Sequence, residues 1–217
     1  MKTLLQLQTS LAYRMGEDSV PNDTNEKARR KSFINEGYRL VMSKHRWWFS
    51  EAYDSFDSVA AKESYGSADG VPTDVREIIE LRYQNVLYTQ LTQNQAMNAY
   101  TTPYTNYSQS YFWFNNKIYP VPAFSTSVTD GVKIKYYKKH TELSADADTI
   151  IIPDDFSDIL VAYAEARVNK IDSERGTASD AFDEFNEILG IMKEENNKYL
   201  FSMKLSGPSS ELVAAYE

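Results

Sequence analysis

The chain has 217 residues and a formal net charge of −8, and 42% of its residues are hydrophobic and 25% are charged, as in an ordinary soluble globular protein. Its length allows a core of normal size and favours one domain over two. The lack of cysteine excludes disulfides, thiolate nucleophiles and cysteine-based metal sites, and the negative charge argues against a surface that grips nucleic-acid phosphates.

The first predicted helix covers residues 2–15. Its apolar residues recur at steps of three and four, namely at Leu4, Leu7, Leu11 and Met15. Gly16 ends the pattern. Polar residues interrupt this stretch too early for the apolar core of a signal peptide, and no apolar run approaches the ~18 residues that a membrane span needs. We therefore expect a soluble protein that is not exported by a signal peptide.

The second predicted helix runs from Asp23 to about Lys44. Asp23 and Glu26 are spaced so that their side chains satisfy free N–H groups at the helix start reciprocally. Gly37 lies within this helix and permits a neighbouring element to pack closely.

The residues Arg46, Trp47, Trp48 and Phe49 form the predicted joint of the fold. A helical pattern precedes these residues in the sequence, and an extended, aromatic-rich pattern follows them. Each indole can bury about 200 Å² of surface while its N–H still needs a partner. We interpret the tryptophans as core anchors, at least one of which locks the following segment against the helices. Docking of another subunit by the second ring stays an open alternative.

A small antiparallel β-subdomain is predicted over about residues 47–137. Residues 79–83 and 132–136 alternate apolar with charged side chains, as half-buried strands do. Residues 111–121 predict a hairpin, because two asparagines at its centre tolerate the positive φ angles of a tight turn.

The segment after residue 90 carries tyrosines in polar surroundings. We expect a short helix over residues 91–100, followed by an exposed loop. Tyr100, Tyr104 and Tyr107 lie in sequence too polar to form a core alone. Because tyrosine is favoured on surfaces that bind other molecules, these rings are a candidate binding loop.

Two further helices are predicted in the last third of the chain, over about residues 154–171 and 177–203. Asp154 and Asp155 suit the start of the first one, because free N–H groups at a helix N-terminus favour negative charge. Gly207 and Pro208 prevent the second one from continuing.

The expected fold class is therefore α+β. An antiparallel bundle of about four long helices, from residues 2–46 and 154–203, carries the inserted β-subdomain, and together they form a single domain over residues 1–203. Residues 204–217 make an extended C-terminal arm. Its apolar anchors are Leu212, Val213 and Tyr216.

No sequence pattern assembles an active site. His45 and His140 lie in different segments without a second ligand at metal-binding spacing, and the common nucleotide-binding and nucleophile motifs are missing. Asp146 and Asp148 could contribute to a hard-cation site, but a calcium loop needs more oxygen ligands and a glycine at the bend. We expect no enzyme, no cofactor and no metal. The basic stretch 27–31 is interpreted as a solvated helix face rather than as a phosphate site.

Several features follow one another in a particular order. They are an N-terminal helix, a second helix ending in Arg46-Trp47-Trp48-Phe49, the turn Val71-Pro72-Thr73-Asp74-Val75, a strand ending in Arg82-Tyr83, the hairpin Trp113-Phe114-Asn115-Asn116-Lys117-Ile118, the strand residues Tyr136-Tyr137-Lys138, and Ile152-Pro153-Asp154 before a helix. In this order they resemble the head-to-tail adaptor proteins of tailed bacteriophages, also called connector or neck-ring proteins. The resemblance covers about residues 1–203 and lies in the shared order rather than in one motif.

The resemblance implies a structural virion protein of the neck, assembled in the host cytoplasm, that forms a homo-oligomeric ring, commonly of twelve copies. Such a ring lies beneath the portal protein, extends the DNA channel without binding the DNA specifically, and offers a platform to tail, stopper or further neck proteins. The arm residues Leu212, Val213 and Tyr216 would then contact the portal. One alternative is a carbohydrate-binding or host-recognition virion module that uses the tyrosine loop, and another is a metal-dependent hydrolase using Asp146 and Asp148.

Overall fold

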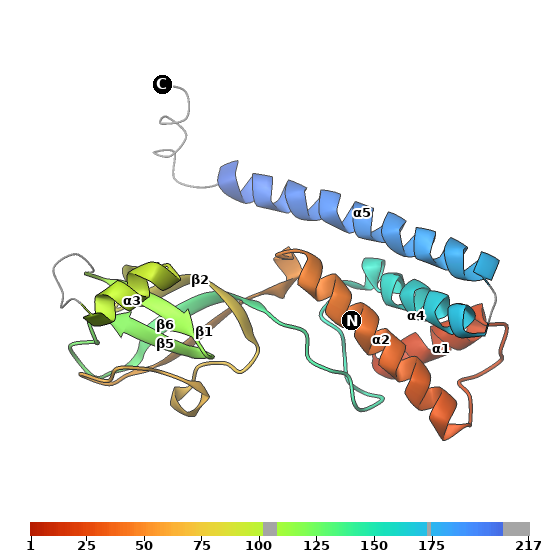
Figure 1. The fold of residues 1–217 in the computed structure, drawn as a ribbon, viewed down its shortest axis with the longest axis horizontal. Helices are drawn as coiled ribbons and strands as arrows, with labels where there is room; N and C mark the ends of the chain where they lie inside the picture. The colour runs from red at the N-terminus through yellow and green to blue at the C-terminus, as the bar shows by residue number, and fades with distance from the viewer. Residues whose placement is uncertain (102–107, 173–174, 206–217) are drawn as a thin grey trace. The chain divides into compact units, whose positions relative to one another are not determined.

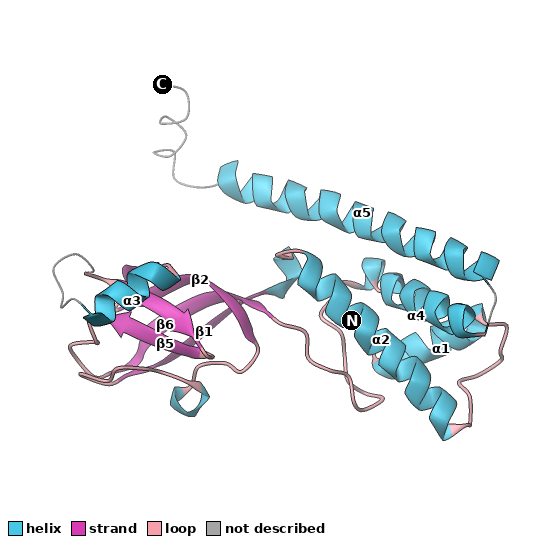
Figure 2. Ribbon diagram, in the orientation of Figure 1, coloured by secondary structure: helices cyan, strands magenta, loops and turns pink. Residues whose placement is uncertain are grey.

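The computed structural model describes residues 1–101, 108–172 and 175–205 of the chain. The chain divides into two compact units. The helical unit comprises Met1–Ser50 and the chain from His140 onward, and the β unit comprises Glu51–Lys139. Figure 1 follows each unit along the chain, and Figure 2 separates helix from strand. The β unit is one continuous stretch, with the helical unit built from sequence on both sides of it.

The described part of the helical unit contains four α-helices around one apolar core. They are α1 (Leu4–Arg14), α2 (Thr24–Lys44), α4 (Asp158–Ile171) and α5 (Arg175–Leu205). α4 is the central element, since every residue from Ile159 to Ala164 is buried and the helix packs against α1, α2 and α5. A helix that is apolar on all sides must be covered on all sides, which explains this position.

The two predicted N-terminal helices are confirmed, and their starts follow from local hydrogen bonds. At α1 the Thr3 side chain accepts from the N–H of Gln6, while the Gln6 side chain accepts from the N–H of Thr3. At α2 the Asp23 carboxylate accepts from the N–H groups of Asn25 and Glu26. The Glu26 side chain turns instead toward arginines of the same helix, so the reciprocal cap expected there is wrong.

Gly37 brings α2 into close contact with α4. A Cβ at this position would lie 2.9 Å from Cδ1 of Tyr163, nearer than real Cβ atoms approach. The Tyr163 hydroxyl donates to the Glu36 carboxylate at 2.8 Å, and burial together with Glu36 raises the pKa of Tyr163 to about 12. The expected close packing at Gly37 is confirmed.

α5 is longer than the core that it covers. It has 31 residues, whereas α4 has 14. Among the α5 side chains whose burial is described, up to residue 202, Met192 and Asn196 are the last buried ones, and Phe201 is 64% exposed. The last helix therefore extends beyond the apolar core of its unit.

The β unit contains a six-stranded curled sheet with the strand order β1-β6-β2-β3-β4-β5. The strands are β1 (Glu51–Ser58), β2 (Val75–Tyr83), β3 (Val86–Gln90), β4 (Ser110–Phe114), β5 (Lys117–Val121) and β6 (Val128–Lys138). All neighbours pair antiparallel except β3 and β4, which pair in parallel. The sheet is therefore mixed.

The parallel pair follows from the helix α3 (Gln93–Thr101) between its strands. Two parallel strands need a long crossover connection, and a helix is its usual form. The short helix predicted here is confirmed, but its role as a crossover was not predicted.

The expected fold is thus wrong in two respects. The described residues form five helices and a six-stranded curled mixed sheet, not a bundle of four long helices with a small antiparallel insertion. α1 and α4 are short, with 11 and 14 residues, and α3 belongs to the β unit. The segment of β1 was predicted as extended sequence without a defined strand, and β3 was not predicted.

The predicted hairpin is confirmed as β4 and β5. Asn115 and Asn116 have φ angles of 50° and 56°, the conformation that their residue type tolerates. In β2, by contrast, the expected alternation fails at Ile79. A register shift between Ile78 and Glu80 buries Ile78 and leaves Ile79 exposed, as a β-bulge does.

Candidate interaction surfaces

The acidic residues considered as metal ligands have structural roles. The Asp148 carboxylate accepts from the backbone N–H groups of Ala145 and Ser144 at 2.8 and 2.7 Å, and these bonds lower its pKa. Asp146 pairs with Lys27 at 2.9 Å. Within residues 1–101, 108–172 and 175–205, no three histidines or carboxylates gather as a metal site would require.

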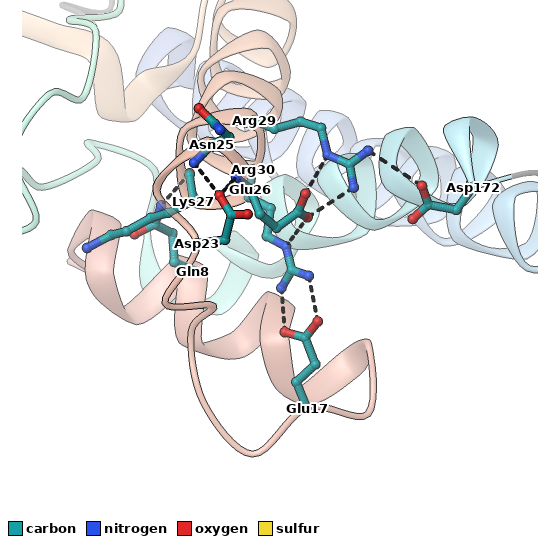
Figure 3. Close-up of polar contacts among 9 residues, drawn as sticks. All are labelled: Gln8, Glu17, Asp23, Asn25, Glu26, Lys27, Arg29, Arg30 and Asp172. Atoms are coloured by element: carbon teal, nitrogen blue, oxygen red, sulfur yellow. Dashed lines mark hydrogen bonds and ion pairs between the residues drawn. The ribbon is translucent and has the colours of Figure 1, made fainter.

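The basic stretch at the start of α2 forms a network of ion pairs, which Figure 3 shows. Arg30 is almost fully buried and holds Glu17 through two hydrogen bonds of 2.6 and 2.7 Å. Its Nε donates to Glu26 at 2.7 Å. This network ties the loop after α1 to α2, because paired and hydrogen-bonded charges are the form in which a buried arginine is tolerated.

Arg29 extends the network to the end of α4. It contacts Glu26 at 2.8 Å and Asp172 at 3.5 Å. Burial of Glu26 opposes its ionisation, but the hydrogen bonds from Arg29 and Arg30 outweigh that effect and lower the pKa of Glu26. The interpretation of this stretch as a solvated face is therefore wrong for the buried Arg30, while Lys27 and Arg29 remain partly exposed and have acidic partners.

The joint residues lie between α2 and β1, in the helical unit. Trp47 is fully buried in the core of that unit, and its indole N–H donates to the carbonyl of Val41 at 2.8 Å. The ring stacks on Phe49 with centroids 5.6 Å apart. Trp48 and Phe49 are half-buried against the same core. The proposed locking of the β unit by an indole stays a prediction.

Asn196 of α5 fixes the backbone of the joint. Its side-chain oxygen accepts from the N–H of Trp48 at 2.9 Å, and its amide nitrogen donates to the carbonyl of Arg46 at 3.0 Å. These bonds provide partners for the peptide carbonyl before Trp47 and for the peptide N–H after it. Sequence reasoning missed this residue, because Asn196 stands in the polar run Glu194-Glu195-Asn196-Asn197-Lys198 without a distinguishing pattern.

The outer face of β1, β2 and β6 carries a hollow of about 530 Å³ with mixed charge. Lys135 pairs with Glu51 at 2.7 Å, and Arg82 pairs with Glu80. The Lys135 ammonium also lies 5.4 Å from the ring centroid of Tyr53, which is 74% exposed. Two of the three cations that line this hollow therefore have carboxylate partners, and the third, Lys133, donates to the side-chain oxygen of Asn85 at 3.4 Å.

A second hollow, of about 630 Å³, lies between α3 and β4; we call it the α3/β4 groove. It is lined by apolar side chains, namely Leu91, Ala96, Met97, Phe112, Trp113 and Phe114. Its polar lining consists of Gln90, Thr92 and Gln93, so no lining residue carries a charge. Sequence reasoning placed a binding loop next to it but did not identify the groove.

The structure does not describe the side chains of the other predicted contact residues. Tyr104, Tyr107, Leu212, Val213 and Tyr216 fall outside the described residues. Tyr100 belongs to the last turn of α3, and its side chain is likewise not described. Their proposed contacts therefore stay predictions.

None of the helices that the structure describes is both long enough and apolar enough to span a bilayer. The family model described as SU10 adaptor protein matches residues 2–205 of the chain. This match includes the whole β unit and the helical unit up to the end of α5. Among curated proteins, none matches this sequence.

Proposed function

Because the chain belongs to the SU10 adaptor protein family, whose members are structural phage proteins, we propose that it forms a ring in the neck of the virion, between portal and tail. The ring would hold about twelve copies, extend the DNA channel and serve as a docking platform for tail, stopper or further neck proteins. Membership of this family identifies the chain as a structural phage adaptor and a virion component.

The observation that carries the proposal is the extent of the family match. Residues 2–205 include both compact units, so the β unit is part of the family's architecture rather than an addition to it. An adaptor needs one surface for each partner, and two units of different construction can supply them.

The charge arrangement supports a passive DNA channel. A lining that bound phosphates through many free cations would hold the DNA by counterion release. In α2 the arginines of the basic stretch are instead paired with Glu17, Glu26 and Asp172. These arginines would have to give up a carboxylate partner to bind the DNA backbone.

A ring of identical subunits also needs two different, complementary patches on each chain. In such a heterologous contact one patch of each copy meets the other patch of the next, and the rotation closes the ring. Exposed apolar side chains supply candidate contact points, since exposed apolar patches often mark protein interfaces. The described residues offer them at the α3/β4 groove and on the outer part of α5, at Phe201.

Association with the portal tests this proposal. The purified chain is mixed with the portal protein of the same phage, and the mixture is analysed by sedimentation velocity. We expect the chain to co-sediment with the portal in a fixed molar ratio near one chain per portal subunit. The same chain mixed with a capsid protein is the control. No co-sedimentation at any salt concentration would contradict the portal contact.

A further inference from the structure

The α3/β4 groove matches one segment of this same chain in chemistry. We propose that it receives the apolar residues 212–216 from the C-terminal segment of a second copy of the chain. The inference rests on the proposed function, because only an assembly brings a second copy close enough. On this proposal the C-terminal segment binds another subunit of the same ring.

The floor and walls of the groove are fixed by packing. Leu91, Ala96 and Phe112 are buried in a small apolar cluster separate from the main core of the β unit. The Phe112 ring stacks on Tyr119 with centroids 4.6 Å apart and planes within 4°. A groove with such a preformed floor does not lose binding energy to its own ordering.

The N-terminus of α3 is also fixed. The Thr92 hydroxyl and the N–H of Thr92 both donate to the side-chain oxygen of Gln95 at 2.9 Å. In addition, the N–H of Leu91 donates to the carbonyl of Tyr111 at 2.7 Å, which holds the start of the crossover to β4. The distance between helix and strand is thus set by hydrogen bonds at this end of the groove.

The rim of the groove exposes large apolar side chains. Met97 is 64% exposed and Phe114 is 62% exposed. Met97 is unbranched and adaptable, a residue type used on surfaces that accept apolar peptide segments. The exposed rim together with the buried floor indicates a surface that another polypeptide covers.

The lining also restricts the kind of segment that fits. It carries no charge, so a charged segment would lose its hydration without gaining a partner. Gln90, Thr92 and Gln93 supply amide and hydroxyl groups that can bond the backbone of an extended peptide. The matching segment is therefore short, apolar, uncharged and extended.

The sequence beyond α5 contains such a segment. Ser206-Gly207-Pro208-Ser209-Ser210-Glu211 is polar, and it is followed by Leu212-Val213-Ala214-Ala215-Tyr216, which is uncharged and mostly apolar. The other stretches outside the described residues, 102–107 and 173–174, contain no comparable run. Twelve residues follow Leu205, and an extended chain of that length spans at most roughly 40 Å. The proposal therefore requires the groove of the neighbouring copy to lie within that distance of the end of α5.

The resemblance to phage adaptors assigned these same apolar residues to the portal. The two destinations are different, and a crosslinking experiment distinguishes them. The chain has no cysteine, so single cysteines can be placed without removing native ones. Gln93→Cys places a thiol at the rim of the groove, and Ala215→Cys places one inside the C-terminal segment while leaving Leu212, Val213 and Tyr216 intact.

The two variants are made as full-length chains with different tags, mixed, and treated with a short bis-maleimide. We expect a covalent species that contains both tags. Tyr53→Cys, on the outer face of the sheet, replaces Gln93→Cys in the matched control and should give only background. Adding Leu212→Asp and Val213→Asp to the Ala215→Cys chain should lower the crosslinked fraction by about tenfold or more, because the groove offers a charge no partner.

Electron microscopy of the same samples separates this inference from the proposed function. If rings form but the crosslinked fraction is no higher than in the Tyr53→Cys control, the groove assignment is wrong and the proposed ring is not affected. This is the result expected if the C-terminal segment binds the portal instead. A crosslink formed only within single chains of the Gln93→Cys, Ala215→Cys double variant would also overturn it. Crosslinks between copies without rings would support the groove assignment and count against the ring. Neither crosslinks nor rings would contradict both.

Discussion

At the scale of single residues, Trp47 is the anchor of the segment between α2 and β1. Its ring is fully buried, its N–H has a backbone partner in Val41, and Asn196 satisfies the peptide groups on both sides of it. A large side chain held in this way has no alternative position. The adjacent Trp48 is only half-buried, so the two tryptophans contribute unequally to stability.

Trp47→Ala should therefore lower the free energy of unfolding by about 3–5 kcal/mol, through lost burial and the cavity that remains. Trp48→Ala should cost clearly less. Tyr13→Ala, at a side chain that is 63% exposed on α1, is the control and should change little. Chemical denaturation followed by circular dichroism measures all three. Equal, small effects of both tryptophan variants would contradict the placement of the joint.

The ion pairs of α2 predict an acid-sensitive contribution to stability. The pKa of Glu26 is lower in the folded chain than its ordinary value, so its contribution is fully present above about pH 4.3 and is lost as the pH falls through the folded-state pKa. Glu26→Gln should cost about 2 kcal/mol at pH 7, because two arginines lose a charged partner. The difference from the native chain should shrink toward pH 3.

Unfolding curves at pH 7, 5, 4 and 3 measure this effect. Glu194→Gln, at an exposed position on α5, is the matched control and should follow the native chain at every pH. A Glu26→Gln deficit that stays constant from pH 7 to pH 3 would show that the carboxylate charge is not the cause.

At the scale of elements, the sequence predicts what local chemistry decides. α1, α2 and the hairpin of β4 and β5 were predicted because capping side chains, apolar spacing and the Asn115-Asn116 turn lie within each element. β3 was missed because only Tyr88 of its residues is buried, while Val86 and Leu87 point outward. The segment of β1 was predicted as extended, but its bounds were not, because its sequence is mainly polar and its pairing with β6 decides its form.

The α3/β4 groove could not be predicted for a related reason. Its lining comes from the end of β3, from α3 and from β4, which only the parallel pairing brings together. The tyrosine loop was predicted from a surplus of tyrosines, yet several of these rings form the core of the β unit. They are Tyr65, Tyr83, Tyr88, Tyr111 and Tyr136. The hydroxyls of Tyr65, Tyr83 and Tyr136 reach polar partners, so tyrosine serves here as a core residue with a polar tip.

The space around two helical glycines, Gly37 and Gly190, predicts opposite effects of alanine at these positions. Gly37→Ala places a methyl group against Tyr163 and should destabilise the chain by about 1–3 kcal/mol. Gly190→Ala, within α5, meets nothing within 4 Å and should stabilise it by about 0.5–1 kcal/mol. Thermal unfolding measures both. A neutral Gly37→Ala would show that α2 and α4 lie further apart than described.

At the scale of the whole molecule, the chain combines a helical unit with a mixed-sheet unit, and one family model covers both. Lys27, Arg29 and Arg30 of its basic stretch are held in internal ion pairs, and its uncharged groove lies on the β unit. An uncharged, largely apolar groove suits the contacts with other virion proteins that an adaptor makes. On this account the β unit and the C-terminal segment make contacts between subunits, while α4 and its neighbours keep each subunit rigid.

The most direct test of the proposed ring is cryo-electron microscopy of the portal mixed with the full-length chain. We expect a closed ring of about twelve chains on one end of the portal, around an open central channel. Chains bound at scattered positions without a closed ring, or portals that remain bare at saturating concentration, would contradict it.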